Sequence, residues 1–309
     1  MFEWAVTSSA ALTYSTEVEA ARESHRPLVA LETSVISQGL PRPRNLEAAI
    51  AAEEAIRECG ATPATLAVIG GRVHVGLETR ELEMMACQDG IDKAGVRDLG
   101  RAIATGSTIA TTVGSSLMIA HRAGISVMAT GGIGGVHRES AETGDISNDL
   151  FVLANTPVLT VCAGIKSVLD LPRTVEMLET LGVALVGFRT NTLPDFYGSD
   201  SGITIPALDD EAAAARMLLA QRSLGISAGI VVANPPPPEH ALERDELDGL
   251  VEEALSSAHG ENIRGKAVTP FLLAHMARAS EGRTVDLNVE LLLSNARLAA
   301  RIALALTSA

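Results

Sequence analysis

Lysine is almost absent from this chain. Of its 24 basic residues, three are lysines (Lys93, Lys166 and Lys266) and the other 21 are arginines. A lysine amine can lose its proton and attack a carbonyl carbon, whereas an arginine guanidinium stays protonated. Because arginine fills nearly every other basic position, each remaining lysine is a candidate amine catalyst, with packing or chance as the competing explanation.

Aromatic residues, cysteines and positive charge are also scarce. Aromatics make up 3% of the chain and the formal net charge is −14, which argues against a protein that binds nucleic acid through a basic or base-stacking face. The three cysteines, Cys59, Cys87 and Cys162, are far apart and lack metal-ligand spacing. The first 27 residues show no secretory pattern, and no apolar run is long enough to span a membrane. We therefore expect reduced thiols in a cytoplasmic protein.

Apolar sequence, by contrast, is abundant, at 47% hydrophobic residues. Short runs rich in β-branched residues alternate with amphipathic helical segments, and no linker interrupts the alternation. This pattern predicts a three-layer α/β/α fold with a largely parallel, mixed central sheet. We assign residues 16–309 to this single catalytic domain and residues 1–15 to a loose N-terminal tail.

The stretch from Thr156 to Pro172 carries the most interesting lysine. Residues 158–162 form a short apolar run that reads as a strand buried on both faces. Gly164 closes the run, Lys166 follows, and we expect a helix over 167–182. Open α/β sheets bind ligands at the carboxyl ends of their strands, so Lys166 lies where a catalytic amine would be useful.

Other polar residues follow predicted strands. Glu32 ends the strand at 27–31 and is a candidate acid or base, with a helix cap or surface charge as the alternative. The glycine-rich segment 131–135 runs into His137 and Arg138, a pattern that suits an anion or sugar site. Lys93 and Arg97 could form a small basic spot for an anionic ligand, or a solvated helix start.

The segment from Glu142 to Leu150 is dense in oxygen ligands. Asp145 and Asp149 are four residues apart, with Ser147 and Asn148 between them, and such sets suit Mg²⁺ or Mn²⁺. A helix cap at Asp145 or Ser147 explains the spacing equally well.

A P-loop-like pattern occurs near the carboxyl end of the chain. Residues 260–266 match G-x-x-x-x-G-K, but Ala267 replaces the hydroxyl residue that would hold Mg²⁺, and a helix rather than a strand precedes the loop. We therefore reject a nucleotide triphosphate site here. In the last helix Asn288 and Asn295 are two turns apart on one face, where they could hydrogen-bond each other or a ligand, with packing as the alternative.

Several of these motifs together resemble one enzyme family, pseudouridine-5'-phosphate glycosidase, also called the indigoidine synthase A-like family. The resemblance covers roughly residues 16–307 and depends on many motifs in the family's order. These are LETSVISQGLPRPRN, PATLAVIGGRVHVGL, GGIGGVHR, DISNDL, CAGIKSVLDLPRTVEMLETLGV, FYGSDSG, VVANPPPPE, GKAVTPFLL and DLNVELLLSNARLAARIA.

The resemblance implies an activity and a role for particular residues. Members cleave the C–C glycosidic bond of pseudouridine 5'-phosphate reversibly to uracil and ribose 5-phosphate, as homotrimers with one divalent metal, typically Mn²⁺, per subunit. The family's proton donor falls on Glu32, its nucleophile on Lys166 and its metal ligand on Asp145. Its substrate contacts fall on the following positions: Lys93, Val113, Ser147, Asn148 and Asp149, with His137 and Asn288 as further lining residues.

Carbon is a poor leaving group, so two carboxylates alone do not suffice for this reaction. An imine between Lys166 and C1' of the ring-opened ribose would let the protonated uracil carbon depart. Two alternatives stay open at this point: a ribokinase-like sugar or nucleoside kinase, and a non-catalytic sugar-phosphate-binding protein. An accessory role in indigoidine formation is a third possibility, suggested by the family's second name.

Overall fold

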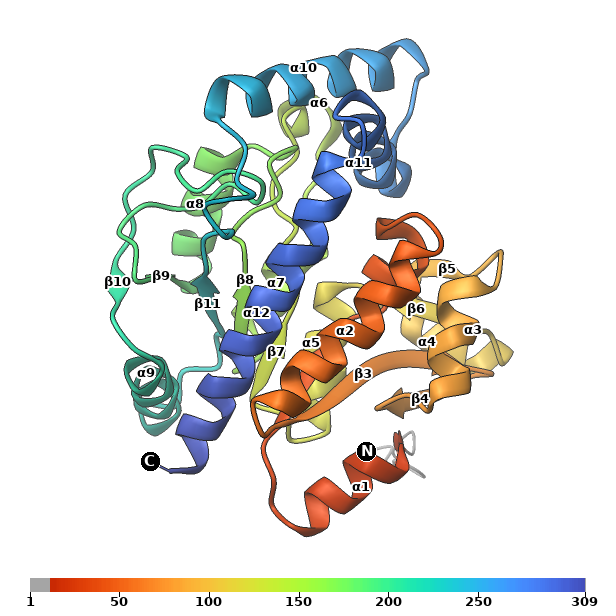
Figure 1. Cartoon of the computed structure of the whole chain (residues 1–309), viewed down its shortest axis with the longest axis vertical. Coiled ribbons are helices and arrows are strands. Elements are labelled where there is room, and N and C mark those ends of the chain that lie inside the picture. Colours follow the sequence, from red (N-terminus) through yellow and green to blue (C-terminus); the bar gives the residue numbers. More distant parts are fainter. Residues whose placement is uncertain (1–11, 309) are drawn as a thin grey trace, which may run out of the picture.

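A mixed sheet of eleven strands organises the chain. The computed structural model describes residues 12–308. The strand order is β1-β4-β3-β2-β7-β8-β11-β9-β10, with β6 paired to β3 and β5 paired to β6. Among the strand pairs of this described part, only β3–β4 and β3–β6 are antiparallel. Helices lie on both faces of the sheet, so the predicted α/β/α architecture with a largely parallel sheet is confirmed (Figure 1).

The strands are short, as expected for a buried parallel sheet. Their bounds are β1 Leu12–Tyr14, β2 Leu28–Leu31, β3 Thr62–Ile69, β4 Arg72–Val75, β5 Asp92–Ala94, β6 Ile109–Thr111, β7 Val127–Ala129, β8 Leu159–Cys162, β9 Ala184–Phe188, β10 Ala207–Leu208 and β11 Ile230–Ala233.

The helices connect these strands and extend beyond the last one. Their bounds are α1 Thr16–Glu23, the π-helix η1 Val35–Gly39, α2 Arg44–Glu58, α3 Thr79–Cys87, α4 Val96–Thr105, α5 Val113–Arg122, α6 Ser140–Thr143, α7 Asn148–Ala154, α8 Leu171–Thr180, α9 Glu211–Ser223, α10 Arg244–Gly260, the 3₁₀ helix η2 Gly265–Ala267, α11 Val268–Ala279 and α12 Arg283–Thr307.

Alternation along the strands builds two hydrophobic layers. In β2, Val29 and Leu31 pack on one face with α2 and α12, while Ala30 packs on the other with α5. In β7, Val127 faces the first layer and Met128 the second. Successive strand side chains point to opposite faces, so a sheet buried on both sides needs continuous apolar runs. Those runs made the central strands predictable.

Helix α12 is the longest helix of the hydrophobic layer that contains Val29 and Leu31. It is 25 residues long, lies diagonally across the sheet in Figure 1, and contacts α2, α9 and strands β2, β7 and β8. Most of one face is apolar, but Asn288 and Asn295 are also buried on it. A buried amide needs partners, so these two positions point to polar groups at the strand ends.

Helices α10 and α11 pack on each other beyond the carboxyl ends of the central strands (Figure 1). Residues 260–267, where the P-loop pattern lies, connect these two helices rather than a strand and a helix. Within residues 12–308 no helix is both long and apolar enough to cross a membrane.

Two local predictions were wrong. Residues 12–14 form strand β1 beside β4 and Ser15 caps α1, so the predicted tail cannot include them; residues 1–11 lie outside the described part of the chain. The helix after Lys166 begins only at Leu171, because Asp170 caps it and Pro172 occupies its first turn. Lys93 lies on strand β5 and Arg97 lies in the first turn of α4, and both line the same cavity, as expected for the predicted basic spot.

Candidate active site

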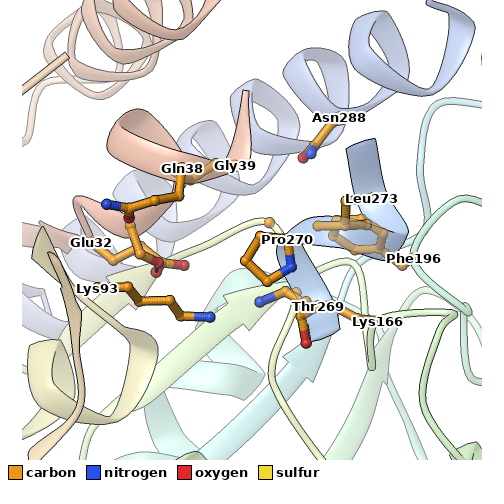
Figure 2. A pocket seen from close by; sticks show the side chains of 14 residues that line it. Glu32, Gln38, Gly39, Lys93, Lys166, Phe196, Thr269, Pro270, Leu273 and Asn288 are labelled. Carbon is orange, nitrogen blue, oxygen red and sulfur yellow. Dashed lines mark hydrogen bonds between the residues drawn. The ribbon is translucent and has the colours of Figure 1, made fainter. Parts of the chain in front are cut away.

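Two adjoining cavities lie at the carboxyl ends of the central strands. The larger measures about 830 Å³ and the smaller about 40 Å³. Their shared residues come from distant parts of the sequence: Glu32, Ser34, Lys93, Lys166 and Thr269. Figure 2 shows Glu32, Lys93 and Lys166 turned toward one space, with Thr269 and Pro270 of α11 beside them. The sheet and the α11 cap therefore form one site.

Glu32 is held by hydroxyl groups on both sides. It follows β2 and is only 5% exposed. Thr130 donates a hydrogen bond to Oε1 and Ser34 donates one to Oε2. Thr130 follows the neighbouring strand β7, so the parallel pairing of β2 and β7 brings it to Glu32. The carboxyl group is thereby fixed in direction, as a positioned acid or base must be.

A chain of hydrogen bonds between buried amide side chains fixes Thr130, which in turn positions Glu32. Nδ2 of Asn295, on α12, donates to the backbone carbonyl of Thr130 at 2.9 Å. Oδ1 of Asn295 accepts from Nδ2 of Asn234 at 2.9 Å, and the same Nδ2 donates to Ser294 at 3.0 Å. Asn295 is fully buried. These side-chain amides provide hydrogen-bond partners for the backbone at the strand end, and they hold Thr130 in position beside Glu32.

Lys166 follows β8 after a sharp turn. Gly164 has φ +84°, and a Cβ at that position would lie 2.1 Å from the carbonyl oxygen of Pro194, so only glycine fits. The amide of Lys166 donates to the carbonyl of Ile133 at 3.3 Å. Within residues 12–308, Lys166 takes part in no ion pair. The turn therefore presents a free amine to the cavity.

Lys93 approaches the site from β5 and is partly buried. Burial lowers its pKa below 10.5, and the nearby charge of Lys166 lowers it further, while Asp149 and Glu32 oppose the shift. Burial likewise lowers the pKa of His137, Asp145 opposes that shift, and the two lysines add to it. The site is thus a poorly solvated place where positive charge is concentrated, which suits an anionic substrate.

Asp149 links two helix starts and the glycine-rich loop. Its Oδ1 accepts from the amide of Gly114 at 2.8 Å, and its Oδ2 accepts from the amide of Gly134 at 3.0 Å. A Cβ on Gly134 would meet Oγ of Ser147 at 2.3 Å, so the loop can approach α7 only through glycine. Ser147 caps α7, which confirms one of the two cap alternatives. Val113 begins α5 at the same cavity.

The metal prediction depends on Asp145 and its neighbour His137. Nε2 of His137 lies 4.0 Å from Oδ2 of Asp145, and both line the larger cavity. No group of three or more His, Cys, Asp and Glu residues is arranged for metal binding in the described chain. A single accessible carboxylate nevertheless fits a hard divalent ion that keeps most of its waters.

All ten predicted site residues line one of these two cavities. Nine line the larger cavity and Asn288 lines the smaller one. The structure adds Ser34, Gln38, Thr130, Phe196 and Thr269, which sequence reasoning missed. Oε1 of Gln38 and Oδ1 of Asn288 are buried without a hydrogen-bond partner in the described chain. Phe196 was noticeable only as one of the chain's few aromatics.

The family assignment now has direct support. A family model described as indigoidine synthase A like protein matches residues 17–305. The chain belongs to the indigoidine synthase A-like family. This agrees with the resemblance carried by the sequence motifs.

Relatives within the indigoidine synthase A-like family include named enzymes. A pseudouridine-5'-phosphate glycosidase of Caldanaerobacter subterraneus subsp. tengcongensis is 50% identical over 293 residues, covering 94% of this chain and 95% of that protein. A protein of the same name from Paracoccus denitrificans is 48% identical over 297 residues, covering 95% of this chain and 98% of that protein.

Solved structures of the family share the fold. The prealnumycin C-glycosynthase AlnA, in complex with ribulose 5-phosphate, gives a TM-score of 0.89 at 38% identity and covers 97% of this chain and 98% of its own. An indigoidine synthase A-like protein of Thermotoga maritima gives 0.86 at 35% identity, covering 94% of this chain and 95% of its own.

Proposed function

We propose that this protein is a pseudouridine-5'-phosphate glycosidase, an enzyme that cleaves the C–C glycosidic bond of pseudouridine 5'-phosphate reversibly to uracil and ribose 5-phosphate. The observation that carries the proposal is the convergence of Lys166 and Glu32 on one cavity. The names of relatives at 50% and 48% identity support the same activity, as does a C-glycosynthase with the same fold.

In this mechanism Lys166 supplies the nucleophile. Ring opening breaks the C1'–O4' bond, leaves the oxygen as a hydroxyl group and makes C1' electrophilic, and the neutral amine of Lys166 adds to C1'. The C–C bond between C1' and the uracil carbon then breaks: its electrons go to the uracil carbon, which is protonated, and the nitrogen lone pair completes the imine at C1'. Water then hydrolyses the imine, which returns the amine and releases ribose 5-phosphate. The amine must be deprotonated to attack.

Glu32 is proposed as the proton shuttle for ring opening and for the departing base. Its two oxygens are fixed by Thr130 and Ser34, so its proton is delivered along a defined direction. The smaller cavity suits the base, because the unpaired oxygens of Gln38 and Asn288 can accept hydrogen bonds from ring N–H groups.

The phosphate of the substrate is proposed to lie in the larger cavity. Lys93 offers a positive charge there. The starts of α5 and α7, at Val113 and at Ser147–Asn148, turn backbone amides toward the same space. Asp149 is already engaged by two amides, so we propose that it shapes this subsite rather than accepting from the substrate.

A divalent metal, Mn²⁺ for preference, belongs to the proposal. Asp145 would hold it, with His137 nearby. When bound, the ion would supply positive charge that orients the sugar.

The proposal also includes the oligomeric state of the protein and its location in the cell. Met118, Ile146 and Phe151 are exposed apolar residues at the rim of the larger cavity, and Phe151 is 63% exposed. Such a patch favours association, and we propose the homotrimer that the family resemblance implies. The unpaired cysteines support a cytoplasmic location. Light scattering after gel filtration tests the trimer.

The decisive experiment is incubation of the protein with pseudouridine 5'-phosphate and Mn²⁺, with chromatographic detection of free uracil. Release of uracil and ribose 5-phosphate in equal amounts supports the proposal. No uracil, with ATP-dependent phosphorylation of a ribose acceptor instead, would replace it with the kinase alternative. Ligand binding without turnover would replace it with the sugar-phosphate-binding alternative.

A further inference from the structure

A third cavity, which we call the rear cavity, lies behind the turn that carries Lys166. It measures about 440 Å³, within the range of small-molecule sites. Its polar residues include Arg138, Ser167, Asp195, Ser201 and Arg244. Arg244 belongs to α10. Two further carboxylates, Asp170 and Asp248, also line the cavity, and the remaining walls are aliphatic.

The rear cavity and the active site are separated by a thin wall of backbone. Three pairs of consecutive residues, 137–138, 166–167 and 195–196, each send one side chain to the active site and one to the rear cavity. His137, Lys166 and Phe196 line the active-site cavities, whereas Arg138, Ser167 and Asp195 line the rear cavity.

The segments of this wall are joined by hydrogen bonds. Nη2 of Arg138 donates to the carbonyl of Ser167 at 3.2 Å. The amide of Phe196 donates to the carbonyl of Ala163 at 2.9 Å, and residues 164 and 195 form a β-bridge. Leu169 lines both the larger active-site cavity and the rear cavity. A ligand that fixes Ser167 or Asp195 would therefore act on the turn that positions Lys166.

The floor of the rear cavity holds polar atoms without partners. Asp195 is 8% exposed and Ser167 is 3% exposed. Oδ1 of Asp195 and Oγ of Ser167 are buried and accept or donate no hydrogen bond within the described chain. Burial raises the pKa of Asp195; the backbone amides of Asp195 and Gly198, and then Arg244, oppose the shift, while Asp248 adds to it. Native proteins seldom leave two such groups in the lining of one cavity unless a ligand or ordered water satisfies them.

The rim carries two guanidinium groups. Arg138 is exposed and comes from the glycine-rich motif, but it faces away from the active site, so the proposed reaction does not use it. Nε of Arg244 lies 3.8 Å from Asp248, and both side chains are mostly exposed. An arginine guanidinium is well suited to binding phosphate, whereas a buried carboxylate is well suited to accepting hydrogen bonds from hydroxyl groups.

We propose that the rear cavity binds a small phosphorylated sugar or polyol. Its phosphate would meet Arg138 and Arg244, and its hydroxyl groups would donate to Asp195 and bond with Ser167. The aliphatic side chains of Leu171, Pro172 and Val251 would cover its C–H groups. Occupancy would alter turnover through the shared wall. The cavity and its ligand class do not depend on the proposed reaction.

Equilibrium titration with ribose 5-phosphate tests this site on the full chain. Two equivalents per chain are expected for wild type, because the active site takes one. Lys93→Gln should weaken the active-site equivalent and leave the other. Arg244→Gln, at the exposed rim, should weaken the rear equivalent by about tenfold or more, the loss expected for one charge-assisted contact. Asp195→Asn should do the same, and Arg216→Gln on α9 serves as the matched exposed control.

A single equivalent that disappears in Lys93→Gln would overturn the proposal. So would a second equivalent that Arg244→Gln and Asp195→Asn leave unchanged, or one that inorganic phosphate fills as tightly as ribose 5-phosphate. Because the titration measures binding, it gives an answer even if no uracil is released from pseudouridine 5'-phosphate. If uracil is released, Arg244→Gln should also reduce the part of ribose 5-phosphate inhibition that added substrate does not relieve.

Discussion

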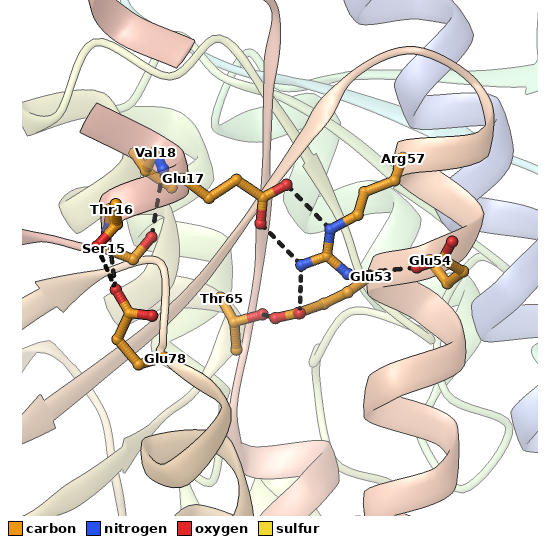
Figure 3. A network of polar contacts seen from close by, with 9 residues as sticks. All are labelled: Ser15, Thr16, Glu17, Val18, Glu53, Glu54, Arg57, Thr65 and Glu78. Atoms are coloured by element: carbon orange, nitrogen blue, oxygen red, sulfur yellow. Dashed lines mark hydrogen bonds and ion pairs between the residues drawn. The ribbon is translucent and has the colours of Figure 1, made fainter. Parts of the chain in front are cut away.

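Two polar clusters in this molecule differ in whether their charged side chains form ion pairs. Around Arg57, in the last turn of α2, every charge has a partner: Nε and Nη2 of Arg57 donate to Glu17 at 2.9 and 2.8 Å, and Nη2 also donates to Glu53 at 3.0 Å (Figure 3). Thr65 of β3 completes the network by donating to Glu53 at 2.6 Å. In the active site, Lys93 and Lys166 face one another without any ion pair in the described chain (Figure 2).

The paired cluster stabilises the fold, whereas the unpaired lysines are proposed to serve binding and catalysis. Pairing raises the pKa of Arg57, mainly through its hydrogen bond to Glu17, so its positive charge is permanent and serves to join α1 to α2. Burial and the neighbouring lysine lower the pKa of Lys93, so a positive charge at this position is disfavoured until an anion binds beside it. Unpaired lysines cost stability, and a site that binds a phosphate and needs a neutral amine has a use for them.

The largest effect should follow removal of the lone amine in the active site. Lys166→Arg keeps the charge but not the nucleophile, so we expect uracil release to fall by about 10⁴-fold or more. Borohydride reduction in the presence of ribose 5-phosphate should attach the sugar to Lys166 in wild type, as read by peptide mapping. An active enzyme without this adduct, or a fully active Lys166→Arg, would rule out the imine.

The second-largest loss of turnover should follow removal of the Glu32 carboxyl group, the proposed proton shuttle. Glu32→Gln should lower turnover by about 10²–10⁴-fold, the usual contribution of a positioned acid or base. Thr130→Val and Ser34→Ala each remove one hydroxyl that fixes Glu32, so each should lower turnover by a smaller factor and alter its pH profile. Unchanged profiles in both variants would mean that the two hydroxyl groups do not position the carboxyl.

Lys93→Met should raise KM by about 10–100-fold with a smaller change in kcat, because a charged hydrogen bond to phosphate contributes about 1.5–3 kcal/mol. Steady-state kinetics with pseudouridine 5'-phosphate measure this split. A loss confined to kcat would instead place Lys93 in the chemical step.

The same variant tests the cost of the unpaired charge. With a folded-state pKa below 10.5, Lys93 binds fewer protons in the folded than in the unfolded chain between the two values. The free energy of unfolding of wild type should therefore rise with pH across that window relative to Lys93→Met. Urea unfolding from pH 7 to 10.5 measures the difference, and parallel curves would show that Lys93 is not destabilised by folding.

The paired cluster should respond only in stability. Arg57→Met leaves Glu17 and Glu53 without their cation, and we expect a loss of about 1–2 kcal/mol because the pairs are half-buried. Burial already raises the pKa of Glu53, so this loss should shrink as acid protonates it. Uracil release should be unchanged, as in the exposed control Arg101→Met. A large loss of activity in the folded variant would contradict the separation of the two clusters.

Much of the fold could be predicted because its central strands are apolar on both faces. Residues 158–162 and 228–233 read as buried strands without any structure. Strand β5 could not be found, since its sequence is Asp92-Lys93-Ala94 and its pairing with β6 is made across 17 residues. A short polar strand has no periodicity that distinguishes it from a loop.

The active site was predictable at its strand ends and in its family motifs. Glu32 and Lys166 each follow a recognisable strand, and the resemblance supplied Lys93 and Val113. Thr130 and Asn295 were beyond prediction in their roles, because their contacts span 98 and 165 residues. Arg138 was expected beside His137 but faces the rear cavity, since the direction of each side chain depends on which segments pack against the loop.

The position of α12 also has a consequence for biosynthesis. This helix covers one face of the central sheet, and its residues Asn288 and Asn295 reach the strand ends, yet it is synthesised after all of the strands that it covers. Until then the apolar residues of β2, β7 and β8 on that face lack their cover, and Thr130 lacks its amide support. The nascent chain is therefore inactive and prone to aggregation until α12 has been synthesised, and a ribosome stalled before residue 283 would hold an incomplete active site.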